Sequence, residues 1–175
     1  MQPVEIRFAT LDDLEAIRAL YHAVTLKGSG IARKTAEVTD SYVRSFIKKS
    51  TDHGILLVAQ ESVNGLLVAE IHAARMEPAV FGHVLTELTV VVHPAFQQEG
   101  IGRHLFQAFL QEVETRHPGI LRVELVAKES NDRAIRFYEQ LGFIREGRLE
   151  RRIASDSGGF EADIPMAWFN PGFRE

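Results

Sequence analysis

The chain has 175 residues, of which 45% are hydrophobic and 25% charged, and its formal net charge is -4. This length supports a substantial core, so we expect one domain over residues 1–175. The negative charge argues against a general nucleic-acid-binding protein, and the absence of cysteine excludes disulfides, cysteine nucleophiles and thiolate metal sites.

No apolar run is long enough to cross a membrane, and the polar start at Met1 is not typical of a signal peptide. We therefore expect a cytoplasmic protein with no membrane partner and no nucleic-acid partner.

The first half of the chain predicts a strand, two helices and a hairpin. Thr10 and Asp13 form a capping box that begins the first helix. Asn64-Gly65 is typical of a hairpin turn between two strands. The expected elements are a strand over 4–8, helices over 10–26 and 39–49, and strands over 55–60 and 66–75.

The second half predicts alternating strands and helices followed by a hairpin. We expect Ser130 to cap a helix that closes at Leu141, with Gly142 as its left-handed cap. Pro165 indicates an edge position or a bulge in the last strand. The expected elements are strands over 84–92 and 120–127, a helix over 101–116, the helix after Ser130, and strands over 143–153 and 160–169.

This order, β-α-α-β-β-β-α-β-α-β-β, predicts a three-layer α/β domain. Strands that feed helices favour parallel pairing near the middle of the sheet, and the hairpins favour antiparallel pairing at both ends. The sheet is therefore expected to be mixed.

The segment from Val90 to Gly102 predicts an anion site. Pro94 ends a β-branched strand, and Gly100 and Gly102 begin a helix whose first N–H groups lack intrahelical partners. Such a helix start suits phosphate. The spacing lacks a P-loop, and Leu105 stands where a dinucleotide fingerprint needs its third glycine. A tight turn without a ligand remains an alternative for this segment alone.

A second motif lies about 30 residues further on. Residues 92–102 match Val-x-Pro-x-x-Arg-Gly-x-Gly-Ile-Gly except that Gln97 and Gln98 replace the arginine and a glycine. Residues 131–143 match Asn-x-x-Ala-x-x-Phe-Tyr-x-x-Leu-Gly-Phe. In this order and at this separation, the two motifs resemble those of the GNAT (Gcn5-related N-acetyltransferase) superfamily.

The resemblance implies an acetyl-CoA-dependent N-acetyltransferase in which the strands over 84–92 and 120–127 splay apart to admit the pantetheine arm. Backbone N–H groups at the helix start would hold the pyrophosphate. By resemblance and position, the expected cofactor-binding residues are Val90, Val91, Val92, Gln97, Gln98, Glu99, Gly100, Ile101, Gly102, Arg103, Asn131 and Tyr138. Asn131 has the alternative of acting only as a helix cap.

The resemblance also implies two catalytic residues. Tyr138 would protonate the leaving thiolate, and its alternative role is that of a core aromatic. Glu87 would accept the proton of the amine, and its alternatives are an exposed strand residue or an ion-pair partner. Direct attack of the amine on the thioester is the expected reaction.

The remaining expectations concern metals and partners. The seven histidines show no metal-ligand spacing, so no metal is expected. His72 and His83 could line the acceptor site, although a structural role is the commoner one. The resemblance implies an acceptor groove built by residues 21–50 and 155–159, and the expected acceptor is a small-molecule primary amine such as an amino acid.

Several alternatives remain open. They are a protein N-terminus or lysine as acceptor, a non-catalytic acyl-CoA-binding module, and an unrelated nucleotide-binding domain. The resemblance also suggests a homodimer.

Overall fold

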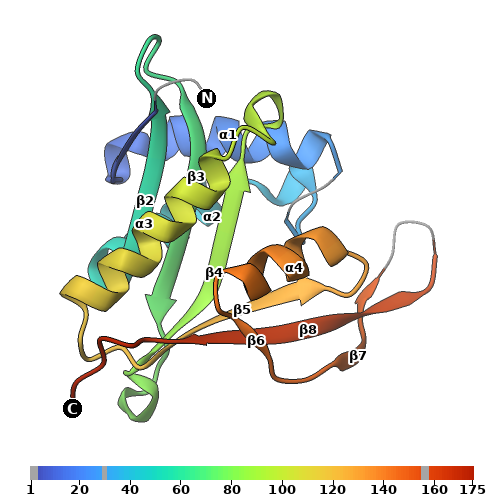
Figure 1. Ribbon diagram of the computed structural model, residues 1–175. Coiled ribbons are helices and arrows are strands. Elements are labelled where there is room, and N and C mark those ends of the chain that lie inside the picture. The colour runs from blue at the N-terminus through green and yellow to red at the C-terminus, as the bar shows by residue number, and fades with distance from the viewer. Residues whose placement is uncertain (1–3, 29–30, 155–157) are drawn as a thin grey trace. The chain divides into compact units, whose positions relative to one another are not determined.

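The structure is a computed structural model that describes residues 4–28, 31–154 and 158–175 (Figure 1). It divides into two compact units, Met1–Arg75 with Thr89–Glu112, and Met76–Leu88 with Val113–Glu175. The strand β4 (Val84–Val92) contributes its first half to the second unit and its last residues to the first. The single domain expected from length remains a prediction.

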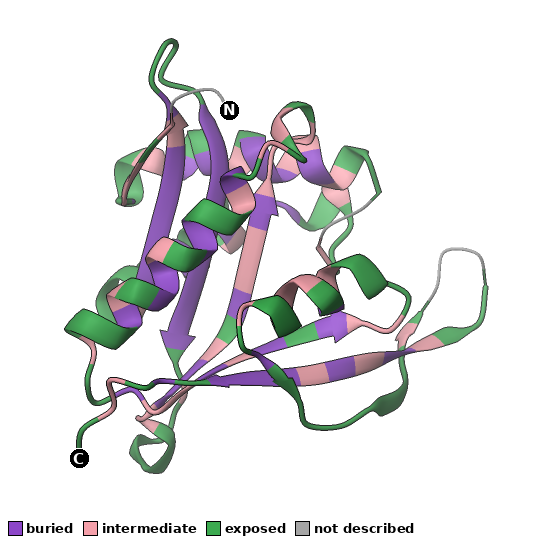
Figure 2. Cartoon of the chain, in the orientation of Figure 1, coloured by how far each residue is buried: buried purple, intermediate pink, exposed green. Residues whose placement is uncertain are grey.

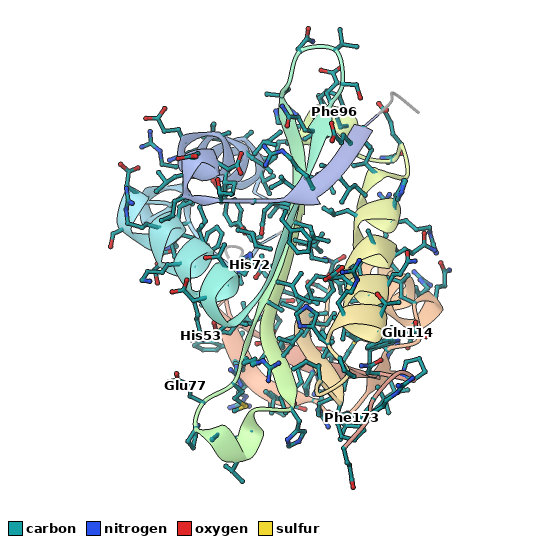
Figure 3. All side chains as sticks on the ribbon, turned by 90° about the vertical axis from the view of Figure 1, so that its left-hand side faces the viewer. His53, His72, Glu77, Phe96, Glu114 and Phe173 are labelled. Atoms are coloured by element: carbon teal, nitrogen blue, oxygen red, sulfur yellow. The ribbon has the colours of Figure 1, made fainter. Side chains whose placement is uncertain are left out.

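The first unit is a sheet covered on both faces. Its strands are β1 (Val4–Phe8), β2 (Gly54–Glu61), β3 (Leu67–Arg75) and the end of β4, in that order. The helices α1 (Leu14–Leu26) and α2 (Asp40–His53) lie on one face, and α3 (Ile101–Arg116), which belongs to this unit up to Glu112, lies on the other (Figures 1 and 3).

The residues of this unit explain its layers. Both faces of β2 and β3 are covered, so the two strands are buried along most of their length (Figure 2) and most of their residues are apolar. The helices present one apolar stripe each. The core on the α1 and α2 face includes Ile17, Tyr21, Val43, Ile47, Val58 and Val91.

The second unit contains the other strands. Its order is β4, β5 (Arg122–Lys128), β8 (Phe160–Phe169) and β6 (Ile144–Arg145), and β7 (Leu149–Ala154) also pairs with β8. The β4–β5 pairing is parallel and joins Val84 to Arg122 and Leu85 to Val123, whereas β5 and β8 pair antiparallel. The expected mixed α/β sheet is confirmed.

Helix α4 (Asp132–Gln140) lies alongside β5 and β8 (Figure 1). Gly142 has a φ of 94°, which confirms the expected left-handed cap. A Cβ at Gly142 would lie 3.4 Å from Cδ1 of Trp168 on β8, so the turn after α4 approaches the sheet closely.

The expectation that one strand covers residues 143–153 is wrong, because the structure contains two short strands, β6 and β7. The break lies opposite Pro165, whose carbonyl accepts a hydrogen bond from the Glu146 amide. Proline has no N–H to complete that pair, so the ladder is interrupted there. Pro165 does not lie on an edge strand, since β8 pairs with β5 on its other side.

A bulge divides β4. The Met76 amide donates to the Val84 carbonyl and the His93 amide to the Val68 carbonyl. Between these bonds β4 advances nine residues and β3 only eight. Glu87 has a φ of 57°, a left-handed value that is rare outside glycine, and it marks the extra residue. The sequence pattern gave no indication of this bulge.

Among the described residues, no helix has both the length and the apolar character needed to cross a bilayer.

Candidate functional site

The turn before α3 forms a cradle of backbone amides in the first unit. Gln98 and Gly100 have φ values of 72° and 84°. The first residues of α3 follow at once, and the His104 amide donates to the Gly100 carbonyl. Turns that alternate between right- and left-handed residues aim successive N–H groups at one point, and a helix start adds a partial positive charge. This segment can therefore hold an anion.

Gly102 fixes the distance between the cradle and the sheet. A Cβ at this position would lie 3.1 Å from Cγ2 of Val92, closer than ordinary van der Waals contact. The glycine thus lets the start of α3 approach the end of β4. The sequence predicted exposed N–H groups here and missed this packing requirement.

The neighbouring residues differ in what they can offer a ligand. Val91 and Ile101 are buried, so only their backbones are candidates for contact, whereas Val90 and Val92 are half-buried. Gln97 donates its side-chain amide to the Val92 carbonyl at 3.2 Å. Glu99 is half-buried, and Arg103 is exposed on the first turn of α3.

Tyr138 lies on α4 in the second unit. Its half-buried ring contacts Phe137 and Phe143, with centroid separations of 5.6 and 6.0 Å. Burial raises the pKa of Tyr138 to about 12. The phenol is therefore protonated throughout the neutral range, as a proton donor requires, and it also has the aromatic packing of the alternative role.

Asn131 caps α4. Its side-chain oxygen accepts a hydrogen bond of 3.1 Å from the Ala134 amide, which is the geometry of an N-cap. The expectation that Ser130 caps this helix is wrong, because the Ser130 hydroxyl donates to the Glu161 carboxylate instead. The side-chain oxygen of Asn131 therefore takes part in the helix cap.

Glu87 is exposed and lies at the bulge of β4, in the same unit as Tyr138. The bulge re-aims the side chains on either side of it, which is a common use of bulges next to functional sites. The left-handed backbone at a glutamate is a strained feature that points to function.

The structure contains a polar cluster that the motifs did not predict. Tyr21, Glu70 and His72 are buried in the first unit and joined by hydrogen bonds. The signal in the sequence was a glutamate and a histidine two residues apart in an otherwise apolar strand, which alternation places on one face. Only His72 was considered in the sequence, and Glu70 was not.

The remaining expectations concern His83, the acceptor groove and metal ligands. His83 is half-buried, and its carbonyl accepts from the Leu121 amide. Residues 29–30 and 155–157 of the expected acceptor groove lie outside the described residues. Within the described parts of the chain, no group of three or more metal-ligating side chains comes together.

Comparison with known proteins gives the family. The model of the acetyltransferase (GNAT) family matches residues 15–143. The chain belongs to this family. The resemblance seen in the two motifs is thereby confirmed.

Curated relatives share part of the sequence. The [ribosomal protein bS18]-alanine N-acetyltransferase of Salmonella typhimurium is 39% identical over 87 residues, which are 48% of this chain and 57% of that protein. A mycothiol acetyltransferase of Streptosporangium roseum is 48% identical over 56 residues, 32% of this chain and 16% of that protein. The chain thus spans little more than half the length of the first of these relatives.

Solved structures confirm the fold. A GNAT-family acetyltransferase from Streptococcus pneumoniae matches with a TM-score of 0.84 at 21% identity, over 95% of this chain and 99% of that one. The protein yncA of Salmonella typhimurium, solved with acetyl-CoA, matches with a TM-score of 0.83 at 22% identity, over 99% and 97% of the two chains.

Proposed function

We propose that this protein transfers the acetyl group of acetyl-CoA to a primary amine. The observation that carries the proposal is the amide cradle formed by Gln98, Gly100 and the start of α3. Its backbone geometry suits a pyrophosphate, and it occurs in a chain whose family is that of the GNAT acetyltransferases. Because Gln97 stands where the family motif has an arginine, the pyrophosphate would be bound by the backbone amides and the helix start without that positive charge.

The residues present fit acetyl-CoA as the acyl donor. Amides from Gln98 to Gly102 would hold its pyrophosphate, and the backbone from Val90 to Val92 would pair with its pantetheine amides. Gly102 allows the start of α3 to lie close to the end of β4, because a side chain at this position would meet Val92. The thioester supplies the electrophilic carbon that the amine attacks.

Two side chains would move protons. Glu87 is exposed, so it can take a proton from an ammonium group, directly or through water, and exchange it with solvent. Tyr138 would donate its hydroxyl proton to the leaving sulfur. Asn131 would add a cofactor contact from the part of its amide that the helix cap leaves available.

We propose a small molecule, such as an amino acid, as the acceptor. The mycothiol acetyltransferase among the relatives is consistent with a small acceptor. The second candidate is the N-terminus or a lysine of a protein, and the similarity to a [ribosomal protein bS18]-alanine N-acetyltransferase supports a protein acceptor. A homodimer and a cytoplasmic location remain predictions.

The decisive experiment measures release of the CoA thiol from acetyl-CoA with amino acids, small amines and peptides that begin with alanine. Release with one class of acceptor supports the transferase and identifies the acceptor. Binding of acetyl-CoA without release of the CoA thiol in the presence of any acceptor would favour the non-catalytic alternative.

The proton acceptor is tested by Glu87→Gln with Glu77→Gln as the matched control, since Glu77 is an exposed glutamate in the same unit. We expect Glu87→Gln to lower kcat about 100-fold, the order typical of a lost general base, and to change its pH profile. An unchanged profile would exclude Glu87 from this role.

A further inference from the structure

The buried cluster in the first unit is a continuous hydrogen-bonded relay. The Tyr21 hydroxyl on α1 donates to one carboxylate oxygen of Glu70 at 2.7 Å. The other oxygen lies 2.8 Å from Nδ1 of His72, two residues further along β3. Tyr21 and Glu70 are 0% exposed and His72 is 5% exposed. A carboxylate at this depth is costly unless it is fully hydrogen-bonded, and here both oxygens have partners.

This geometry favours one tautomer of the imidazole. When Glu70 is a carboxylate, its oxygen accepts a hydrogen from Nδ1, so the neutral ring carries its lone pair on Nε2. Burial and the Glu70 charge keep the pKa of the Tyr21 hydroxyl well above its usual value, so Tyr21 stays a donor. The relay therefore presents one proton-accepting nitrogen, with a negative charge behind it to balance an imidazolium.

The surroundings of His72 are mostly apolar. Its ring stacks on Phe46 of α2 at 4.3 Å, and its strand neighbour on β2 is Leu56. Two other titratable or charged groups of the described residues lie near Tyr21 and Phe46. Tyr42 contacts both rings, and the Arg33 guanidinium lies 3.8 Å from the Tyr42 ring. Figure 3 shows His72 where α2 faces the sheet.

The register places this ring beside the strand proposed to bind the donor. His93 bonds to Val68, and four residues along each antiparallel strand His72 lies opposite Thr89. Opposite residues have Cβ atoms about 5 Å apart on the same face of a sheet. Val91 would by the same register lie opposite Glu70, and it shares the core that contains Tyr21. His72 thus lies on the strand next to the segment from Thr89 to Val92, and all of these residues belong to one unit.

We propose that the Tyr21–Glu70–His72 relay accepts a proton from the acceptor amine at Nε2 of His72, an inference that rests on the proposed function. An ammonium group must lose two protons to become an amide. Solvent takes the first, and the free amine forms its C–N bond as the C–S bond breaks. His72 takes the second proton from the nitrogen, and the leaving sulfur gains one proton. Exchange with solvent then restores His72, and the reaction releases one proton overall.

The test compares four variants with the wild type. His72→Gln should lower kcat about 100-fold, in the range expected for a lost proton acceptor, with the KM for acetyl-CoA nearly unchanged. Its pH profile should lose one ionisation. Glu70→Gln should also lower kcat because it no longer enforces the Nδ1–H tautomer, and Tyr21→Phe should have a smaller effect. His53→Gln, at the exposed end of α2, should match the wild type.

Two results would overturn the relay alone. One is a folded His72→Gln protein whose kcat lies within about twofold of the wild type with the same pH profile, since a lost proton acceptor costs far more. The other is an Nε2–H tautomer of His72 in the imidazole ¹⁵N spectrum of the wild type, a measurement that needs no variant to fold. Failure of the wild type to release thiol with any amine would instead overturn the proposed function, and the relay with it.

Discussion

Removing the hydroxyl of Tyr138 should make the protein less sensitive to alkaline pH. Burial raises the pKa of this phenol from 10.0 to about 12 in the folded state. In the unfolded chain it ionises near its ordinary value, so the unfolded state loses its proton first as pH rises. The stability contributed by Tyr138 is thus complete below pH 10 and is lost as pH rises towards about 12.

The size of this effect follows from the shift. Each pKa unit corresponds to about 1.36 kcal/mol, so the full loss over two units is about 2.7 kcal/mol above pH 12. At pH 11, where the unfolded phenol is mostly ionised and the folded one mostly protonated, the wild type should lose about 1.4 kcal/mol. Tyr138→Phe should lack this loss.

Urea unfolding of both proteins at pH 8 and pH 11 measures the difference. Other groups, including the buried Tyr21, titrate in both proteins and cancel when the two are subtracted. The stability of the wild type relative to Tyr138→Phe should fall by about 1.4 kcal/mol between these pH values. Parallel changes in the two proteins would refute the argument that Tyr138 is desolvated.

Three further outcomes follow from the packing. Gly102→Val should weaken acetyl-CoA binding at least about tenfold in calorimetric titration, because the new Cβ would lie 3.1 Å from Val92. Similar affinities would show that the cradle does not depend on this approach. Asn131→Ala should cost about 1 kcal/mol in chemical denaturation and Asn131→Asp much less, because aspartate keeps the cap. Equal losses would argue against capping. Phe106→Ala should cost about 3–5 kcal/mol in the same assay, because Phe106 is 0% exposed, and a loss under 1 kcal/mol would contradict its core position.

The sequence predicted most of the elements because their signals are local. The capping box at Thr10, the Asn64-Gly65 turn and the left-handed Gly142 each act over a few residues, and the structure confirms all three. The helix from Ile101 was likewise correct in both bounds.

The predictions that failed did so because of contacts between residues that are distant in the sequence. Two strands replace one near residue 146 because of Pro165, which lies about 20 residues further along the chain. Ser130 does not cap α4 because Glu161, a residue of β8, takes its hydroxyl. The Tyr21–Glu70 bond joins residues 49 apart, so no local pattern could predict it. The roles of Tyr138, Glu87 and Asn131 came from the family resemblance and remain proposals.

The extra residue in β4 shifts the alternation of side chains between the part of the strand before Glu87 and the part after it. In a regular strand the buried positions alternate, but the buried residues of β4 are Val84, Leu85, Leu88 and Val91, which do not follow a single alternation. Deleting Glu87 would restore strict alternation and turn either Leu85 or Val91 away from its present core. A single deletion at an exposed position would therefore act like a buried substitution. The fold depends on the chain length at this position more than on the Glu87 side chain, whereas the proposed proton transfer depends on the carboxylate.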